Sequence, residues 1–207
     1  MRNKKRMTIK YSALRIPHST LAMRLFIAIE LPPEIKQGIM KVQEQLRTAG
    51  ANAGWTRPEG IHLTLKFLGE VEESRVDEIR NALASAVGAK DKLRLSIAGS
   101  GAFPNAKNPR VLWLGVAGDI EKLSAVQVSV ENAMTGLGFE REERKFSPHL
   151  TLARIKFPKP RDNWQQKIES IRDVKLGEFE ADRVSLMKSE LKREGAVYTE
   201  VGRIELT

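Results

Sequence analysis

The stretch His62-Leu63-Thr64-Leu65 occurs a second time as His149-Leu150-Thr151-Leu152, 87 residues further along the chain. The same offset places an apolar, alternating segment at 24–29 on another at 111–116. In both halves the pattern predicts a strand, a helix, a glycine-bearing loop and then the strand that carries the histidine. Two copies of such a unit are too few for a solenoid. They predict two lobes related by a pseudo-two-fold axis, with a cleft between them.

Apolar periodicity sets the remaining expectations. Alternating residues predict strands, and residues repeating every three or four positions predict helices. The strands are expected at 24–31, 61–68 (closed by Gly69), 93–97, 110–116 and 148–155, and the helices after Pro32, over 76–87, after a capping Asp119, and over 163–172.

Two further segments complete the pattern. Residues 99–109 are rich in Gly, Pro and Asn and predict a loop. The end of the chain predicts two long strands, 174–192 and 196–206, around a turn at Arg193-Glu194-Gly195. Because this closing hairpin is antiparallel, the alternation of strands and helices indicates an α+β fold rather than a doubly wound parallel sheet.

The positive charge of the chain is concentrated at its start. The 207 residues carry a formal charge of +9, and residues 1–22 contain six basic residues and no acidic one. The remaining 29 basic residues face 26 acidic ones, so global charge is weak support for a polyanionic partner. We expect residues 1–22 to be a disordered basic extension, or sequence upstream of a start at Met23, and residues 23–207 to form the domain.

Composition excludes several classes of site. The chain has no cysteine, which excludes disulfides, cysteine-based zinc sites and a thiol nucleophile. No apolar run approaches the roughly 20 residues of a membrane span, and the basic start lacks the apolar core of a secretory signal. A cytoplasmic protein without a cofactor is the default expectation.

The repeated motif points to acid–base chemistry. Side chains alternate along a strand, so His62 and Thr64 face one way while the intervening leucines face the other, and the same holds for His149 and Thr151. The pseudo-two-fold relation would bring two imidazoles and two hydroxyls around one space. With an ordinary pKa near 6.5, one imidazole can act as general base and the other as general acid, while the hydroxyls stabilise an oxyanion. This arrangement suits in-line displacement at phosphorus without a metal, although geometry leaves open which histidine is the acid. Zinc is the chemical rival, but two histidines leave at least one ligand to be found.

Three segments together resemble the two-histidine (2H) phosphoesterases, and within them the RNA 2',3'-cyclic phosphodiesterases, formerly called 2'-5' RNA ligases. These segments are MRLFIAIELP at 23–32, IHLTLKFLGE at 61–70 and PHLTLAR at 148–154. The resemblance implies a bilobal fold with an antiparallel sheet flanked by helices in each lobe. It implies hydrolysis of a terminal RNA 2',3'-cyclic phosphate to a 2'-phosphate, with His62 as proton donor and His149 as proton acceptor. Thr64 and Thr151 would hydrogen-bond the phosphate oxygens.

Candidates for further substrate contacts are less clear from the pattern. Lys66 continues the His-Thr face of its strand and could reach phosphate. Phe67 and Phe103 could stack on a base, and Trp55 precedes the first motif, but each is also explained by packing. Strict alternation puts Arg154 on the leucine face, away from the substrate, unless the strand bends.

Two other functions use the same residues. Reversible 2'-5' joining and cleavage of RNA would run through the same groups, and a non-catalytic RNA- or nucleotide-binding module would keep the lobes without the chemistry. The expected partners are RNA ending in a 2',3'-cyclic phosphate, such as tRNA fragments, or cyclic nucleotides, bound by a monomer.

Overall fold

The structure is a computed structural model that describes residues 22–49, 53–157, 159, 162–193 and 195–207. The expected basic extension therefore lies outside the described residues, except for Ala22, which begins the first strand. Within the described residues the chain forms nine strands, four α-helices and two 3-10 turns: β1 Ala22–Glu30, α1 Pro33–Arg47, β2 Ala53–Trp55, η1 Pro58–Gly60, β3 His62–Glu72, η2 Glu73–Arg75, α2 Val76–Val87, β4 Leu93–Phe103, β5 Val111–Gly118, α3 Ile120–Gly136, β6 His149–Ile155, α4 Trp164–Ser170, β7 Lys175–Ala181, β8 Arg183–Lys192 and β9 Gly195–Glu205. No helix among the described residues is long and apolar enough to cross a membrane.

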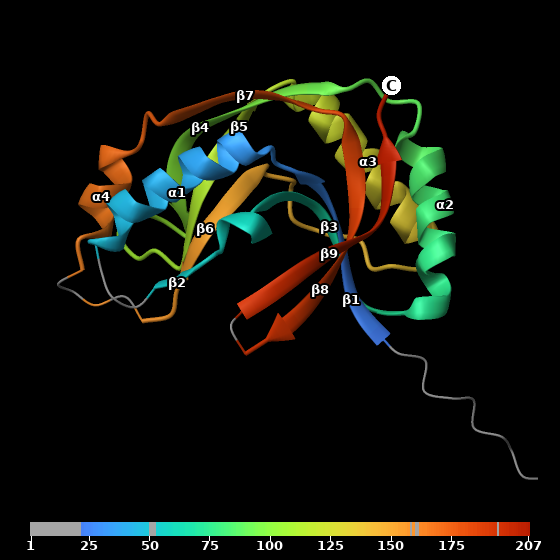
Figure 1. The fold of residues 1–207 in the computed structure, drawn as a ribbon, viewed down its shortest axis with the longest axis horizontal. Helices are drawn as coiled ribbons and strands as arrows, with labels where there is room; N and C mark the ends of the chain where they lie inside the picture. The colour runs from blue at the N-terminus through green and yellow to red at the C-terminus, as the bar shows by residue number, and fades with distance from the viewer. Residues whose placement is uncertain (1–21, 50–52, 158, 160–161, 194) are drawn as a thin grey trace, which may run out of the picture.

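Two antiparallel sheets confirm the predicted α+β fold. One has the strand order β3-β1-β8-β9 and the other β2-β6-β5-β4-β7. Each sheet combines strands from before and after the middle of the chain: β1 pairs with β8, and β4 pairs with β5. Figure 1 shows the C-terminal hairpin β8–β9 (red) beside the N-terminal strand β1 (blue). The lobes are therefore not the two halves of the sequence, because the halves exchange strands.

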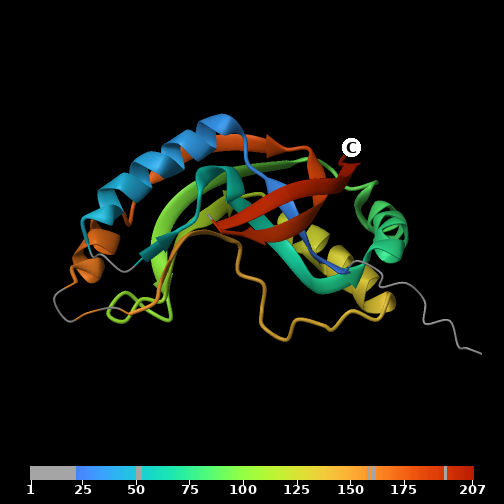
Figure 2. The same cartoon turned by 60° about the horizontal axis from the view of Figure 1, so that its bottom comes forward.

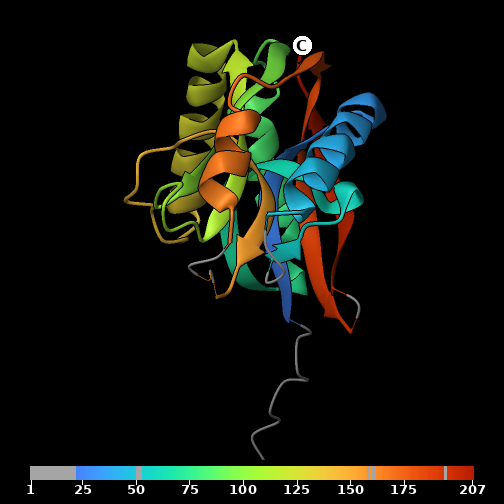
Figure 3. The same cartoon turned by 90° about the vertical axis from the view of Figure 1, so that its left-hand side faces the viewer.

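The helices are exchanged in the same way. Helix α1, from the first half, packs on β7 of the five-stranded sheet, and α3, from the second half, packs on α2 and on β3 of the four-stranded sheet. Figure 3 shows α1 and α3 on opposite sides of the sheets. The apolar stripe that predicted α1 (Ile35, Ile39, Val42 and Leu46) is buried, and Pro33 lies in the first turn, where its missing N–H costs nothing. Most buried apolar side chains of both sheets belong to one continuous core, and Phe26, Ala28 and Met187 form a separate small cluster on the other face of the four-stranded sheet.

Several element boundaries differ from the expectation. Strand β3 runs through Gly69 to Glu72, since Gly69, at φ +76°, lies at a register shift against β1 rather than in a terminating turn. Strand β4 likewise continues to Phe103 through the segment expected to be a loop. Gly101 is needed there because a Cβ at this position would lie 2.3 Å from the Trp113 ring on β5. The short strand β2, which pairs with β6, was expected to be a loop.

The largest difference concerns the predicted strand 174–192. It is two strands in two different sheets: β7 pairs with β4, and β8 pairs with β1 after the chain turns at Asp182. Only β8 and β9 form the expected hairpin. Asp119 precedes α3 as predicted but does not cap it through its side chain, because its Oδ2 accepts a hydrogen bond from the Arg94 N–H at 3.0 Å instead.

The strand pairing corrects the internal alignment of the repeat. On the motif strands Thr64 matches Thr151, an offset of 87 residues. Their pairing partners are Ala28 on β1 and Trp113 on β5, which are 113 − 28 = 85 residues apart. Ile27 is thus equivalent to Leu112 and not to Leu114. The displacement of two residues keeps the same face of the strand, and both Ile27 and Leu112 are buried.

Candidate active site

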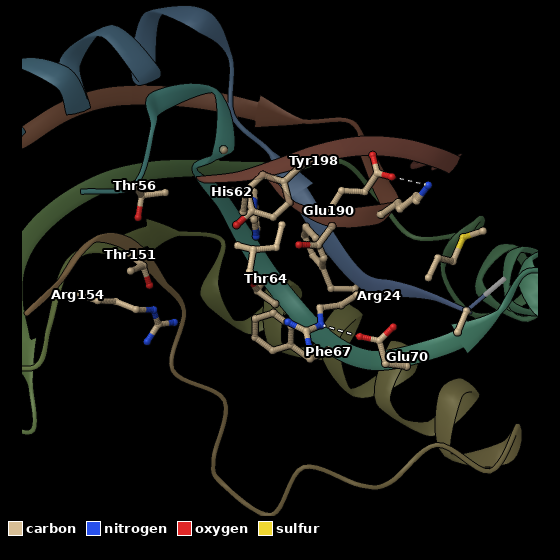
Figure 4. A pocket seen from close by; sticks show the side chains of 18 of the residues that line it. Arg24, Thr56, His62, Thr64, Phe67, Glu70, Thr151, Arg154, Glu190 and Tyr198 are labelled. Carbon is tan, nitrogen blue, oxygen red and sulfur yellow. Dashed lines mark hydrogen bonds and ion pairs between the residues drawn. The ribbon is translucent and has the colours of Figure 1, made fainter. Parts of the chain in front are cut away.

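The two motifs meet in one cleft between the sheets. His62 and Thr64 on β3 and His149 and Thr151 on β6 all line a cleft of about 870 Å³. Figure 4 shows Thr64 and Thr151 approaching the cleft from opposite sides, beneath His62. The leucines between them, Leu63, Leu65, Leu150 and Leu152, are buried in the core. The alternation of each motif therefore places its polar pair in the cleft.

Each motif strand contains a bulge directly after its His-Thr pair. Thr64 pairs with Ala28 and Lys66 pairs with Ile27, so Leu65 has no partner on β1. Leu152 is skipped in the same way on β6. A bulge adds one residue and so reverses the faces of those that follow. Phe67 and Arg154, at equivalent positions of the repeat, consequently point into the cleft (Figure 4).

The bulge also removes Lys66 from the His-Thr face that it was expected to continue. Its side chain is 2 % exposed, and its Nζ lies 2.6 Å from Oε1 of Glu131 on α3 and donates to the Glu140 carbonyl at 2.8 Å. Lys66 does not line the cleft. Strict alternation gave the wrong face for Lys66 and for Arg154 for the same physical reason.

His62 is enclosed by aromatic rings. The Phe26 ring stacks on it at a centroid distance of 4.5 Å, and Tyr198 on β9 meets it edge to face at 5.1 Å. Burial disfavours the charged imidazolium and lowers the pKa of His62 from 6.5 to about 4, helped by the positive charge of Lys36 and opposed by a hydrogen bond to the backbone of Gly60. In the free protein His62 is therefore neutral at pH 7.

His149 is oriented by a backbone contact. Its Nδ1 lies 2.7 Å from the Ser147 carbonyl oxygen. Because a carbonyl can only accept, Nδ1 carries the proton in this contact, and in the neutral ring Nε2 is left with a free lone pair. Phe103 meets the ring edge to face at 5.1 Å. His149 is thus arranged to accept a proton at Nε2.

Sequence reasoning missed Tyr198 as a lining residue. It reaches the cleft because β9 belongs to the same sheet as the strand that carries His62. Local periodicity cannot predict this strand order. Trp55 lies outside the cleft lining, packs on Trp164 and receives the Arg47 guanidinium 4.9 Å above its ring. Among the residues that the structure describes, no three His, Cys, Asp or Glu side chains are grouped so that they could hold a metal ion.

Comparison with known proteins agrees with this geometry. The model of the LigT-like phosphoesterase family matches the chain twice in succession, over residues 29–113 and 114–198. Proteins named RNA 2',3'-cyclic phosphodiesterase are similar along most of their length. The one from Methanocaldococcus jannaschii is 39% identical over 85% of this chain and 96% of its own, and the one from Methanothermobacter thermautotrophicus 35% identical over 87% and 97%.

Solved structures give the same picture. TT0787 of Thermus thermophilus superimposes with a TM-score of 0.71 at 29% identity, over 89% of this chain and 98% of that one. E. coli LigT complexed with 3'-AMP superimposes with a TM-score of 0.67 at 27% identity, over 90% and 99%. The doubled family match divides the chain between the two His-Thr motifs, so sequence, cleft and relatives lead to one assignment: this chain belongs to the LigT-like phosphoesterases of the 2H superfamily.

Proposed function

We propose that the protein hydrolyses the terminal 2',3'-cyclic phosphate of RNA to a 2'-phosphomonoester, with His149 as general base and His62 as general acid. The observation that carries this proposal is the convergence of two His-Thr pairs, from two strands of one chain, on one cleft. The names of the relatives support the substrate class. The structure of E. coli LigT complexed with 3'-AMP supports a nucleotide as the ligand.

The reaction uses each of the four side chains. Nε2 of His149 takes a proton from water as the water oxygen attacks phosphorus. The bond between phosphorus and the 3'-oxygen breaks, and this oxygen receives the proton from His62, which leaves a 3'-hydroxyl and a 2'-phosphate. The hydroxyls of Thr64 and Thr151 donate to the non-bridging oxygens, where negative charge develops. Arg154, on the cleft face beyond Thr151, supplies a positive charge to the same anion.

His62 has to gain a proton before it can act as the acid. Its enclosed position disfavours the imidazolium in the free protein. A phosphodiester anion in contact with the ring favours the charged form and raises its pKa again. Substrate binding and proton uptake by His62 are therefore coupled in this mechanism.

The test is product analysis with an oligonucleotide that ends in a labelled 2',3'-cyclic phosphate. The wild type should release a 2'-phosphate end, and His62→Ala and His149→Ala should each lower kcat/KM by about 10²- to 10⁴-fold. Lys122→Ala, an exposed change outside the cleft lining, is the control and should leave the rate unchanged. Full activity in either histidine variant, or a 3'-phosphate product, contradicts the proposal.

A further inference from the structure

A 2',3'-cyclic phosphate lies at the 3' end of an RNA, so the polymer continues from it in one direction only. This inference rests on the proposed function: when the cyclic phosphate sits between the two histidines, the rest of the RNA must leave the cleft on one side. RNA binding without base recognition depends on cations that meet backbone phosphates. The distribution of free cations around the cleft therefore bears on the route.

One end of the cleft carries cations that have no carboxylate partner among the described residues. We call it the β6 end and define it by Arg154, Arg110, Lys156 and Lys107. Arg154 pairs across the strands with Val111, the Arg110 carbonyl accepts from the Ile155 N–H at 2.9 Å, and the Arg110 guanidinium donates to the Lys156 carbonyl at 2.6 Å. These contacts place Arg110 and Lys156 next to each other where β6 ends and β5 begins, just beyond Arg154, and Lys107 lies in the turn from β4 to β5.

The charges of the β6 end are available to a ligand. Its four cationic side chains are exposed. Within the described part of the chain, no Asp or Glu side chain forms an ion pair with any of them. The hydrogen bond from Arg110 to a backbone carbonyl leaves its positive charge uncompensated.

The opposite end of the cleft has a different balance. There the Arg24 guanidinium lies 3.2 Å from the Glu70 carboxylate, and Lys188 lies 3.1 Å from Glu190. Glu73 lines the same end without adding a cation. Figure 4 shows Arg154 on one side of the cleft and the Arg24–Glu70 pair with Glu190 on the other. An RNA strand leaving by this end would meet carboxylates beside each cation.

We propose that the RNA chain 5' of the cyclic phosphate leaves the cleft over the β6 end, with the reacting phosphate beside Arg154 and the next phosphates along Lys156 and Lys107. Arg154 lies in the cleft itself and the other three residues of the β6 end lie outside it, so the proposal separates the reacting nucleotide from the polymer. Cyclic mononucleotides should be bound by the cleft alone. Oligonucleotides should gain affinity from the β6 end, and this gain should fall as salt is raised.

The test compares two substrates, 2',3'-cyclic AMP and a short oligonucleotide ending in a 2',3'-cyclic phosphate. The double variant Lys107→Glu/Lys156→Glu should raise KM for the oligonucleotide by about tenfold or more at low salt, and should lower the slope of log KM against log salt by about 1.4, since each phosphate contact with single-stranded nucleic acid contributes about 0.7. KM for 2',3'-cyclic AMP should not change. The matched control Lys92→Glu/Lys122→Glu makes the same change in net charge at exposed positions outside the cleft lining. It should leave the ratio of the two KM values unchanged.

Three results overturn the inference: an unchanged KM ratio in Lys107→Glu/Lys156→Glu, an equal loss on both substrates, or a larger rise for the oligonucleotide in Lys188→Glu at the opposite end. Failure of the proposed function looks different, because the wild type would then hydrolyse neither substrate. In that case the β6 end is still tested by the binding of an oligonucleotide with a 2'-phosphate end, which fluorescence anisotropy measures in the same variants. Loss of binding in Lys107→Glu/Lys156→Glu would support it, and unchanged binding would overturn it.

Discussion

His62 is held between the rings of Phe26 and Tyr198, in surroundings that disfavour a positive charge. The ring is therefore neutral in the free protein, although the proposed mechanism needs it protonated in the substrate complex. In this mechanism His62 takes up its proton only when an anion lies beside it. The free energy that disfavours the protonated ring in the folded protein makes the stability of the fold depend on pH.

The first prediction concerns the free energy of unfolding. The pKa of His62 is about 4 in the folded protein and near 6.5 in the unfolded chain, so between these pH values the unfolded chain binds more protons. This contribution to stability is complete above pH 6.5 and is lost as the pH falls towards 4, by about 3 kcal/mol in all. Denaturant unfolding at pH 7 and pH 4 should show this loss in the wild type and a smaller one in His62→Gln.

An independent measurement checks the same prediction. In the folded protein, the NMR resonances of the His62 ring, assigned by their absence in His62→Gln, should titrate with a midpoint near pH 4. This midpoint should move to higher pH when inorganic phosphate is added. A midpoint near 6.5 without phosphate would contradict it. An equal pH dependence of the unfolding free energy in the wild type and in His62→Gln would also contradict it.

The side chains that meet in the cleft were predictable where the repeat marks them. His62, Thr64, His149 and Thr151 follow from two tetrapeptides and the period of a strand. The orientation of Lys66 and Arg154 does not, because it depends on an unpaired leucine in each strand, and a bulge is a property of the pairing between two strands. The aromatic enclosure of His62 likewise comes in part from Tyr198, on a strand far away along the chain.

At the scale of elements, the bulge in β3 connects the strand that carries His62 to α3. It turns Lys66 into the interior, where its ammonium pairs with Glu131. Oε1 of Glu131 also accepts the N–H of Glu142, and Lys66 also donates to the Glu140 carbonyl. These bonds hold the start of the irregular segment 139–148, which leads into His149 (Figure 2).

The second prediction separates two contributions of the Lys66–Glu131 pair to stability, the mutual compensation of the two buried charges and the hydrogen bonds to the backbone of residues 140 and 142. Lys66→Met leaves the Glu131 carboxylate buried without its cation and should cost about 3–5 kcal/mol of unfolding free energy. Lys66→Met/Glu131→Leu removes both charges and should cost less, with about 1–3 kcal/mol remaining for the unpaired backbone groups of residues 140 and 142. Denaturant unfolding measures both values. The idea fails if the double variant is as unstable as Lys66→Met.

Element boundaries were predictable where a local apolar pattern defines a single element. They were less predictable where the chain passes from one sheet to the other. The stripe of α1 and the alternation of β1 are local signals, and both elements form as expected. The break at Asp182 has no local turn signal, because neither glycine nor proline marks it and apolar residues recur on both sides of it. Only the pairing of β7 with β4 and of β8 with β1 separates them.

At the scale of the whole molecule, each half of the sequence completes the sheet of the other. Strands β1 and β3 need β8 and β9, and β5 and β6 need β4, while most of the buried apolar side chains form one core across both sheets. The sequence predicted two lobes from the two copies of the repeat, without predicting which strands each lobe contains. Exchange between halves leaves no mark on local periodicity, so pattern alone could not show it.

The third prediction follows from this exchange. A cut in the turn between β4 and β5, giving residues 22–106 and 107–207, should yield two fragments that are each unfolded alone, because each lacks strands and helices that cover its apolar faces. Mixing the fragments should restore the sheet signal in circular dichroism. Cooperative unfolding of either fragment by itself would contradict the exchanged architecture.

The exchange of strands also bears on how such a cleft could arise. A polypeptide with one copy of the repeat could complete neither sheet, but two identical chains could do so about a true two-fold axis, each bringing one His-Thr pair to a shared centre. A dimer of that kind has two identical walls and cannot tell one end of a phosphodiester from the other. Joining the copies into a single chain lets equivalent positions diverge, as Phe67 and Arg154 have done here. Duplication followed by fusion thus supplies what a symmetric ancestor lacks, a cleft with a direction.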